Sequence, residues 1–462
     1  MSINSALLAG ASGLISNSNA LASISDNIAN VNTVGYKRAE TAFVPLFESR
    51  GENTRYAAGG VQSLSRLEIS RSGLLTPGTS TTDLAISGDG FFVVRQKAEG
   101  NTSADPVFFS RSGQFQADAE GFLRNDAGHY LSGWPVQQDG SVTANPSDLT
   151  ALETINLTSI GGAAEATENV AINANFQTSQ AVSIAEATYA ATASATNMAS
   201  GTVTPDFQRS IPIYDSQGAV RTLTLSALKS SNPNEWHAEL HVEPASDVTT
   251  GATLVDGQVA TGVIAFDAEG RIDLTNTTLP LSLDFLSSEN VGALGGSEFQ
   301  WAFSTGVAAQ SITIDLGSPT SPGGVTQFDS PSALLSTTVD GSPFGDFSGV
   351  EVDNQGFVFA KFTNGIVKKI FQIPLASFIN PDGLEARGGG AYSVTPDSGA
   401  FTLNAPGIGS AGAIASQTLE ASNVDLATEF TQLITTQRAY SASSKIITTA
   451  DEMLDEAIRM KR

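Results

Sequence analysis

The sequence predicts a mainly β fold, with two β-rich domains, inner and outer, and long N- and C-terminal α-helices that form an assembly-dependent coiled coil. Two observations lead to this fold class. Both ends of the 462-residue chain carry apolar residues at seven-residue intervals, the repeat of helices that pack along a seam. The middle is rich in glycine (44 residues), poor in charged residues (15%), and contains short apolar runs joined by Asp-x-x-Gly turns, as is typical of β-hairpins.

The N-terminal region, residues 1–34, is expected to contain an amphipathic helix over residues 3–29. Its apolar residues at seven-residue spacing are Leu7, Leu14, Leu21 and Ile28. At 1.5 Å per residue this helix is roughly 40 Å long. Gly35 follows a polar stretch and is of a type that commonly ends helices.

The middle of the chain is expected to form β structure in two domains. Its predicted parts are an extended connector with some strand (35–75), the first half of the inner domain (76–150), an inserted outer domain (151–324) and the second half of the inner domain (325–411). The Asp-x-x-Gly turns begin at Asp118, Asp215, Asp267 and Asp353. Residues 161–201 are rich in Ala, Thr, Ser and Asn, and they are expected to be irregular.

The C-terminal region, residues 412–462, is expected to be one long helix with an apolar seam. The seam consists of Leu419, Leu426, Leu433, Tyr440, Ile447 and Leu454, with Phe430 and Ile458 on the same face. Proline is absent from the region, and glycine is absent after Gly412. The seam requires a partner helix. Packing of both terminal helices on their own domain, as ordinary surface helices, is the alternative.

Pairing of the two terminal helices with each other is expected to be marginal. The apolar surface of the two seams is small compared with the conformational entropy lost when both segments become ordered. Copies of the same seam on neighbouring molecules are the simplest source of more apolar contact. We therefore expect the termini to be loose in the monomer and to become ordered on assembly.

Composition argues against several classes of function. The net charge of −24 disfavours nucleic-acid binding and docking on anionic lipid. Cysteine is absent, and no apolar run approaches the length of a membrane span. The first residues lack the basic start of a secretory signal peptide, so export would use a route that reads no such signal.

No catalytic, cofactor-binding or metal site is expected. His237 and His241 would share a face on a helix, but the residues around them alternate apolar and polar as in a strand. On a strand the two imidazoles would lie roughly 13 Å apart, too far for one ion. Residues 407–412 match a dinucleotide-binding glycine pattern formally, but no further strand follows the helix after them.

Several stretches resemble, in order, the signatures of flagellar rod and hook proteins. They are residues 24–37 (ISDNIANVNTVGYK), 82–94, 109–115, 419–426 (LEASNVDL) and 437–440 (QRAY). The signature residues that we single out are Asn27, Asn30, Asn32, Gly35, Asn423 and Asp425. Residues 211–218, 221–225 and 378–384 resemble the outer domain of the longer, hook-type members of this family.

The resemblance implies a structural subunit without enzymatic activity or cofactors. Such subunits polymerise outside the cell into the curved, hollow flagellar hook, a universal joint that transmits torque from rod to filament. The implied partners are copies of the same chain, the rod, the hook cap, the hook–filament junction proteins and the type III flagellar export apparatus. Neither nucleic-acid binding nor membrane insertion is implied.

Two other interpretations of the sequence remain open at this point. A distal rod protein of the same family is disfavoured by the length of the chain. A secreted β-rich adhesin or carbohydrate-binding protein would account for the β-rich middle but not for the paired terminal seams.

Overall fold

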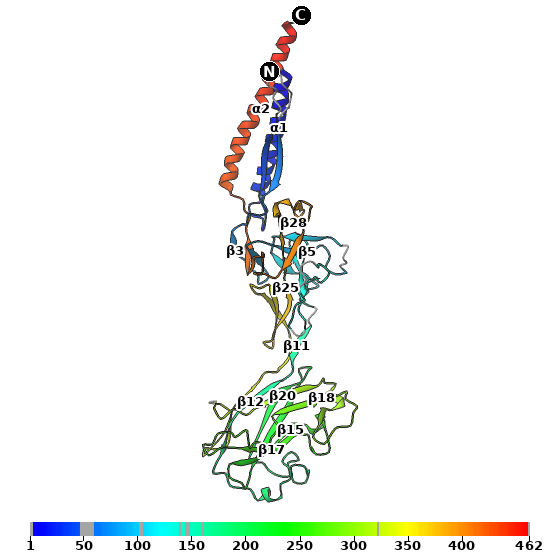
Figure 1. Cartoon of the computed structure of the whole chain (residues 1–462), viewed down its shortest axis with the longest axis vertical. Helices are drawn as coiled ribbons and strands as arrows, with labels where there is room; N and C mark the ends of the chain where they lie inside the picture. The colour runs from blue at the N-terminus through cyan, green and yellow to red at the C-terminus, as the bar shows by residue number, and fades with distance from the viewer. Residues whose placement is uncertain are drawn as a thin grey trace. The chain divides into compact units, whose positions relative to one another are not determined.

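The computed structural model describes residues 3–46, 60–100, 105–137, 140–143, 148–158, 161–320 and 323–460. The chain divides into two compact units (Figure 1). The helix-bearing unit comprises Met1–Ile160, Gly349–Lys361 and Val367–Arg462, and the inserted unit comprises Gly161–Ser348 and Phe362–Ile366.

Two long helices, one from each end of the chain, lie side by side in the helix-bearing unit (Figure 1). Helix α1 spans Ile3–Ala29, which confirms the predicted bounds. Helix α2 spans Leu426–Met460. No helix among the described residues is long and apolar enough to cross a membrane.

The prediction that the C-terminal helix begins near residue 412 is wrong. Residues before the helix form two short strands, β30 (Ala413–Ser416) and β31 (Thr418–Glu420). Strand β30 pairs with β4 (Leu84–Ser87) and β31 with β3 (Leu75–Pro77), so their backbone groups are committed to sheet partners. The helix begins only after Asp425, whose Oδ1 accepts hydrogen bonds from the amides of Ala427 and Thr428 as an N-cap.

The predicted connector is more ordered than expected, because part of it forms a hairpin that packs on α1. Strands β1 (Ala39–Pro45) and β2 (Val61–Leu67) pair antiparallel in full register. Ser16 Oγ on α1 donates to the carbonyl of Val61, and Asn19 Nδ2 donates to Ser63 Oγ. Residues 47–59 of this segment lie outside the described residues.

The rest of the helix-bearing unit is a β domain built around β5 (Phe91–Arg95). A central path of strands runs β25–β9–β5–β6–β28–β27, and every residue of β5 is buried. The other strands of this path are β6 (Val107–Ser110), β9 (Tyr130–Pro135), β25 (Val367–Gln372), β27 (Glu385–Arg387) and β28 (Ala391–Ser393). Flanking strands are β7 (Phe115–Ala117), β8 (Leu123–Asn125), β10 (Glu153–Thr154), β26 (Leu375–Phe378) and β29 (Phe401–Asn404), and a 3-10 turn spans Pro381–Gly383.

The inserted unit packs two sheets around one apolar core. A four-stranded sheet has the order β13–β14–β15–β17, and a seven-stranded sheet has the order β16–β19–β18–β20–β12–β21 with β22 also on β12. The first sheet contains β13 (Phe207–Tyr214), β14 (Val220–Lys229), β15 (Glu235–Glu243) and β17 (Gln258–Ala265). The second contains β12 (Asn169–Gln177), β16 (Val248–Thr250), β18 (Ser282–Leu286), β19 (Phe299–Trp301), β20 (Gln310–Asp315), β21 (Val325–Phe328) and β22 (Ala333–Val339). Phe176 and Trp236, one from each sheet, meet with ring centroids 4.9 Å apart.

The remaining elements of the inserted unit are short or lead out of it. They are β11 (Gly162–Glu165), which pairs with the start of β23 (Ser342–Val352), and 3-10 turns at Ile184–Thr188, Ala245–Asp247 and Phe303–Thr305. Strands β23 and β24 (Phe357–Phe362) carry the chain between the two units.

The predicted end of the outer domain at residue 324 is wrong, because β21 and β22 belong to the inserted unit. Strand β12 pairs parallel with β21 and antiparallel with β22, and Asp340 Oδ1 accepts from the amides of Glu168 and Asn169. These contacts close the sheet across more than 150 residues of sequence, as the Val170–Val339 pair shows. The predicted boundary near residue 320 therefore falls within one unit.

The Ala- and Thr-rich stretch 161–201 contains β11, β12 and a loop that a buried carboxylate holds in place. Glu239 is fully buried on β15. It accepts hydrogen bonds from Tyr189 Oη (2.8 Å) and from the amides of Met198 and Ala199. Burial and the adjacent Glu239 raise the pKa of Tyr189, so its phenol stays protonated. The predicted strand around His237 and His241 is confirmed as β15.

Candidate assembly interface and its polar anchor

Helix α2 packs closely against α1 at two glycines of α1, Gly10 and Gly13. A Cβ on Gly10 would lie 3.1 Å from Cγ1 of Ile447, and one on Gly13 would lie 3.2 Å from Oγ of Ser443. A side chain at either position would fit only if the facing α2 side chain moved slightly, so the glycines allow close packing here. The two helices therefore pair with each other within one chain.

The structure places the predicted seam residues in three different environments. Those that are half-buried are Leu7, Leu14, Leu21, Ile28, Leu433, Ile447 and Leu454. Those that are exposed are Leu426, Phe430, Tyr440 and Ile458. Leu419 lies in strand β31 and is not part of the helix. The seam within one chain is therefore shorter than predicted.

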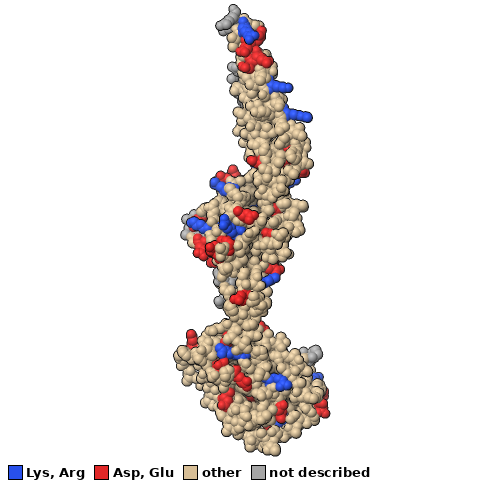
Figure 2. Space-filling view, turned by 180° about the vertical axis from the view of Figure 1, so that it is seen from behind, with Lys and Arg blue, Asp and Glu red and all other residues tan. Residues whose placement is uncertain are grey.

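Two apolar rows on α2 lack cover from α1. One row consists of Leu426, Phe430 and Ile434, and the other of Ile446, Met453 and Met460, with exposed fractions from 39% to 78%. At about 100° per residue the two rows lie on opposite sides of the face that meets α1. On α1, Leu8 and Ile15 are also exposed. Figure 2 shows few charged side chains over the helical part of the molecule except near its free end.

A polar cluster lies at the base of the helix pair, and we call Asn27, Arg38 and Glu429 the helix-base cluster. Asn27 on α1 is fully buried, and its side chain pairs with the backbone of Ala39 as a strand would. Oδ1 accepts from the Ala39 amide at 2.8 Å, and Nδ2 donates to the Ala39 carbonyl at 2.9 Å. Nδ2 also donates to Glu429 Oε2 at 3.1 Å, and Tyr36 Oη donates to Oδ1 at 3.2 Å.

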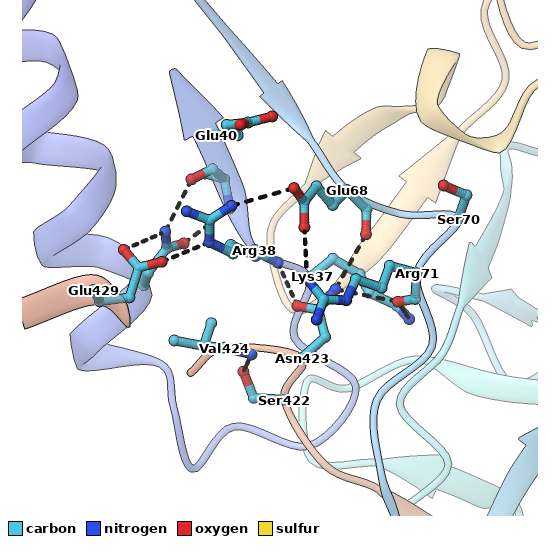
Figure 3. Close-up of polar contacts among 12 residues, drawn as sticks. Lys37, Arg38, Glu40, Glu68, Ser70, Arg71, Ser422, Asn423, Val424 and Glu429 are labelled. Atoms are coloured by element: carbon cyan, nitrogen blue, oxygen red, sulfur yellow. Dashed lines mark hydrogen bonds and ion pairs between the residues drawn. The ribbon is translucent and has the colours of Figure 1, made fainter. Parts of the chain in front are cut away.

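Glu429 of α2 is a fully buried carboxylate within this cluster. Arg38 Nε donates to Glu429 Oε1 at 2.5 Å, and Nη1 donates to Glu68 (Figure 3). Arg38 Nη2 donates to Gln432. Burial acts to lower the pKa of Arg38, but the hydrogen bond and charge of Glu429, together with the charges of Glu68 and Glu40, outweigh burial and leave this pKa raised. A buried carboxylate is tolerated here because charged and neutral donors surround it.

A second group, which we call the buried ion cluster, consists of Lys37, Arg111 and Glu420. Lys37 Nζ donates to Glu420 Oε1 and to the carbonyl of Arg71, both at 2.7 Å. Arg111 Nη1 donates to Glu420 Oε2 at 3.2 Å. Each of the three residues is at most 2% exposed. Burial lowers the pKa of Lys37, and the charge and hydrogen bond of Glu420 counteract this only in part.

The remaining signature residues mostly shape the backbone around these two clusters. Asn423 Oδ1 accepts from the amide of Arg38, and its Nδ2 donates to the carbonyls of Glu68 and Arg71. Asp425 is the N-cap of α2. Gly35 has φ +69°, and a Cβ there would lie 2.8 Å from the carbonyl carbon of Arg111.

The other two signature residues lie at the end of α1. Asn30 Nδ2 donates to the carbonyl of Asp26, and its Oδ1 accepts from Thr33. Asn32 is exposed, and it lines a cavity of about 570 Å³ together with residues that include Arg387 and Tyr392. These two residues contact neither the helix-base cluster nor the buried ion cluster in the hydrogen bonds described above.

Sequence reasoning missed the charged members of both clusters. One signal was present for Glu429, because it lies four residues before Leu433 and so falls on the apolar face of α2 in a chain poor in charge. Lys37 and Arg111 offered no comparable signal, since the residue that pairs with both lies more than 300 positions away.

Four family models match the chain, and together they cover most of it. Residues 7–37 match "Flagella basal body rod protein" and residues 85–186 match "Flagellar hook protein FlgE/F/G D1 domain". Residues 186–342 match "Flagellar basal body protein FlaE D2 domain", and residues 415–460 match "Flagellar basal body rod FlgEFG protein C-terminal".

Whole-length relatives settle which branch of these proteins the chain resembles. It is 38% identical to the flagellar hook protein FlgE of Caulobacter vibrioides, and the alignment covers 100% of both chains. The chain belongs to the flagellar hook protein family. The FlgE proteins of Rhizobium meliloti (32% identity, 100% of both chains) and Treponema pallidum (30% identity, 99% of both chains) are further relatives of this family.

These relatives favour the hook-type member over the distal rod protein considered from the sequence. Most members of the two clusters fall within the matched regions, and Arg38 lies one residue beyond the N-terminal match. Asn27 and Lys37 lie in the N-terminal match, Arg111 in the next, and Glu420 and Glu429 in the C-terminal match. These members of the two clusters thus come from three regions of the chain that separate family models match.

Proposed function

We propose that the chain is the structural subunit of the bacterial flagellar hook and that it polymerises through its two terminal helices. The observation that carries this proposal is the pair of uncovered apolar rows on α2. Leu426, Phe430 and Ile434 form a row on a helix that already uses a different face for α1. Exposed apolar rows of this kind mark surfaces of protein association. A second copy of the same helix pair offers matching rows.

The rest of the proposal follows from family membership. The polymer is a curved tube outside the cell that works as a universal joint and transmits torque, with the helices inside and the β units further out. Its partners are copies of itself, the rod, the hook cap, the hook–filament junction proteins and the flagellar export apparatus. The subunit leaves the cell through that apparatus without a cleaved signal peptide, and it has no enzymatic activity.

Electron microscopy of the purified chain tests the assembly surface. Phe430→Asp is expected to abolish tubes, because it places a charge in an apolar contact between copies. The unfolding midpoint of the monomer is expected to change little, because Phe430 is 52% exposed within one chain.

Thr431→Asp is the matched control, since it adds the same charge to an exposed neighbour about 100° around the helix. Tubes are expected to persist in that variant. Tubes of normal length and number from the Phe430→Asp chain would refute the role given to this row.

A further inference from the structure

The apolar seam between α1 and α2 does not by itself fix how the helices align. Leu433, Tyr440, Ile447 and Leu454 repeat every seven residues, so sliding α2 by seven residues replaces one apolar side chain by the next. The position opposite Gly13 tolerates the same slide. A shift of seven exchanges Ser443 for Ala450 or Thr436, and all three side chains are small.

The helix-base cluster, by contrast, does not tolerate such a slide. Asn27 uses its full hydrogen-bonding capacity, because Oδ1 accepts twice and Nδ2 donates twice. A shift of seven residues brings Thr436 to the place of Glu429. Threonine supplies no charge for Arg38, so this cation would lose the buried carboxylate at its Nε and keep only the contact of Nη1 with Glu68.

We propose that the helix-base cluster is a register lock that selects one heptad alignment of α2 against α1. The lock joins three elements at one point: Asn27 from α1, Glu429 from α2 and Arg38 from the residue that precedes hairpin strand β1. Buried polar residues at coiled-coil core positions specify alignment at some expense of stability. This inference concerns pairing within one chain and does not depend on polymerisation.

Disulfide trapping reads the alignment directly, because the natural chain has no cysteine. A Cβ on Gly13 would lie 3.9 Å from Cβ of Ser443, within the range that a disulfide bridges. The matched reporter is therefore Gly13→Cys with Ser443→Cys. The shifted reporter is Gly13→Cys with Ala450→Cys, seven residues further along α2. In glutathione buffers, gel mobility separates intrachain from interchain products.

With the natural cluster, the intrachain disulfide of the matched reporter is expected to form with an effective concentration at least roughly tenfold above that of the shifted reporter. Asn27→Asp is nearly isosteric but cannot donate to Glu429 and adds a like charge beside it. This change is expected to reduce the matched-to-shifted ratio by roughly tenfold. Adding Glu429→Gln, which restores a donor, is expected to recover part of the ratio.

Asn32→Asp is the control, because it makes the same chemical change at an exposed position of the same signature. If Asn27→Asp prevents folding, Glu429→Gln alone serves as the test variant and is expected to lower the ratio. Both the dispersed chain and sedimented tubes are measured, so failure to form tubes does not affect the result. Equal trapping by both reporters in the natural background, or a ratio unchanged by Asn27→Asp and Glu429→Gln, would overturn the lock. If the cluster only adds stability, these substitutions are expected to reduce disulfide trapping by both reporters equally and to leave the ratio unchanged.

Discussion

Glu420 is the residue on which most of the buried ion cluster depends. Its side chain accepts from Lys37, Arg111 and the amide of Gly73, and its own carbonyl accepts from the amide of Gly35. It thereby connects the strand before α2, the turn after α1 and the inner β domain. The cost of burying two cations is offset only while this carboxylate is charged.

Glu420→Gln is therefore expected to destabilise the helix-bearing unit by about 3 kcal/mol, the usual effect of removing one charge from a buried ion pair. Urea unfolding at neutral pH, followed by far-ultraviolet circular dichroism, measures this change. Glu385→Gln is the control, because Glu385 pairs with Arg387 at 2.9 Å on the surface, with both side chains more than half exposed. An equal loss of stability in the two variants would contradict the importance given to the buried cluster.

At the residue scale the sequence predicted apolar positions better than polar ones. The seven-residue repeat predicted Leu433, Ile447 and Leu454 as seam positions, and all three are half-buried within one chain. The partners of Glu420 and Glu429 lie up to 402 positions away, and no local spacing encodes such pairs. Knowledge of the signature identified Asn27 as important but did not reveal that it contacts Glu429.

At the element scale the terminal helices behave differently from the strands. The helix-base cluster and the close glycine contacts order α1 and α2 against each other, yet Phe430, Ile446 and Met453 remain uncovered. Helices with so little apolar cover gain most of their stability from packing against further partners. The bounds of α1 followed from periodicity, whereas the start of α2 did not, because pairing of β30 and β31 overrides the local pattern.

Helix content is accordingly expected to rise when the chain assembles. Far-ultraviolet circular dichroism of monomers and of sedimented tubes measures the change in the helical signal from the 27 residues of α1 and the 35 of α2. A chain that lacks residues 426–462 should retain its β signal and show no such increase. Equal helix content before and after assembly would show that the helices are already fully formed in the monomer.

At the scale of the whole molecule the chain is two cores joined by a few crossing segments. The core of the inserted unit draws on both of its sheets, with Phe176, Trp236 and Trp301 buried. The insertion itself was predicted from the resemblance to the longer, hook-type members of the family. Its end was not predictable, because the pairing of β12 with β21 and β22 is a long-range contact.

The inserted unit is expected to fold when excised as residues 161–348. Its thermal midpoint should lie within a few degrees of the matching transition of the full chain, because its core is complete without the other unit. Differential scanning calorimetry of the fragment and the full chain provides the comparison. A fragment that shows no cooperative transition would indicate that the two cores depend on each other.

The helix-base cluster and the buried ion cluster join residues from opposite ends of the sequence, and this separation determines when they can form during folding. Arg38 and Lys37 belong to the first tenth of the chain, while Glu420 and Glu429 belong to its last tenth. A chain that emerges progressively from its N-terminus exposes these two cations long before their anions arrive. Formation of the two clusters is thus among the last steps of folding, since it requires a loop of almost the entire polypeptide to close. A chain that lacks its C-terminal residues cannot form the two clusters, so their formation distinguishes complete chains from incomplete ones.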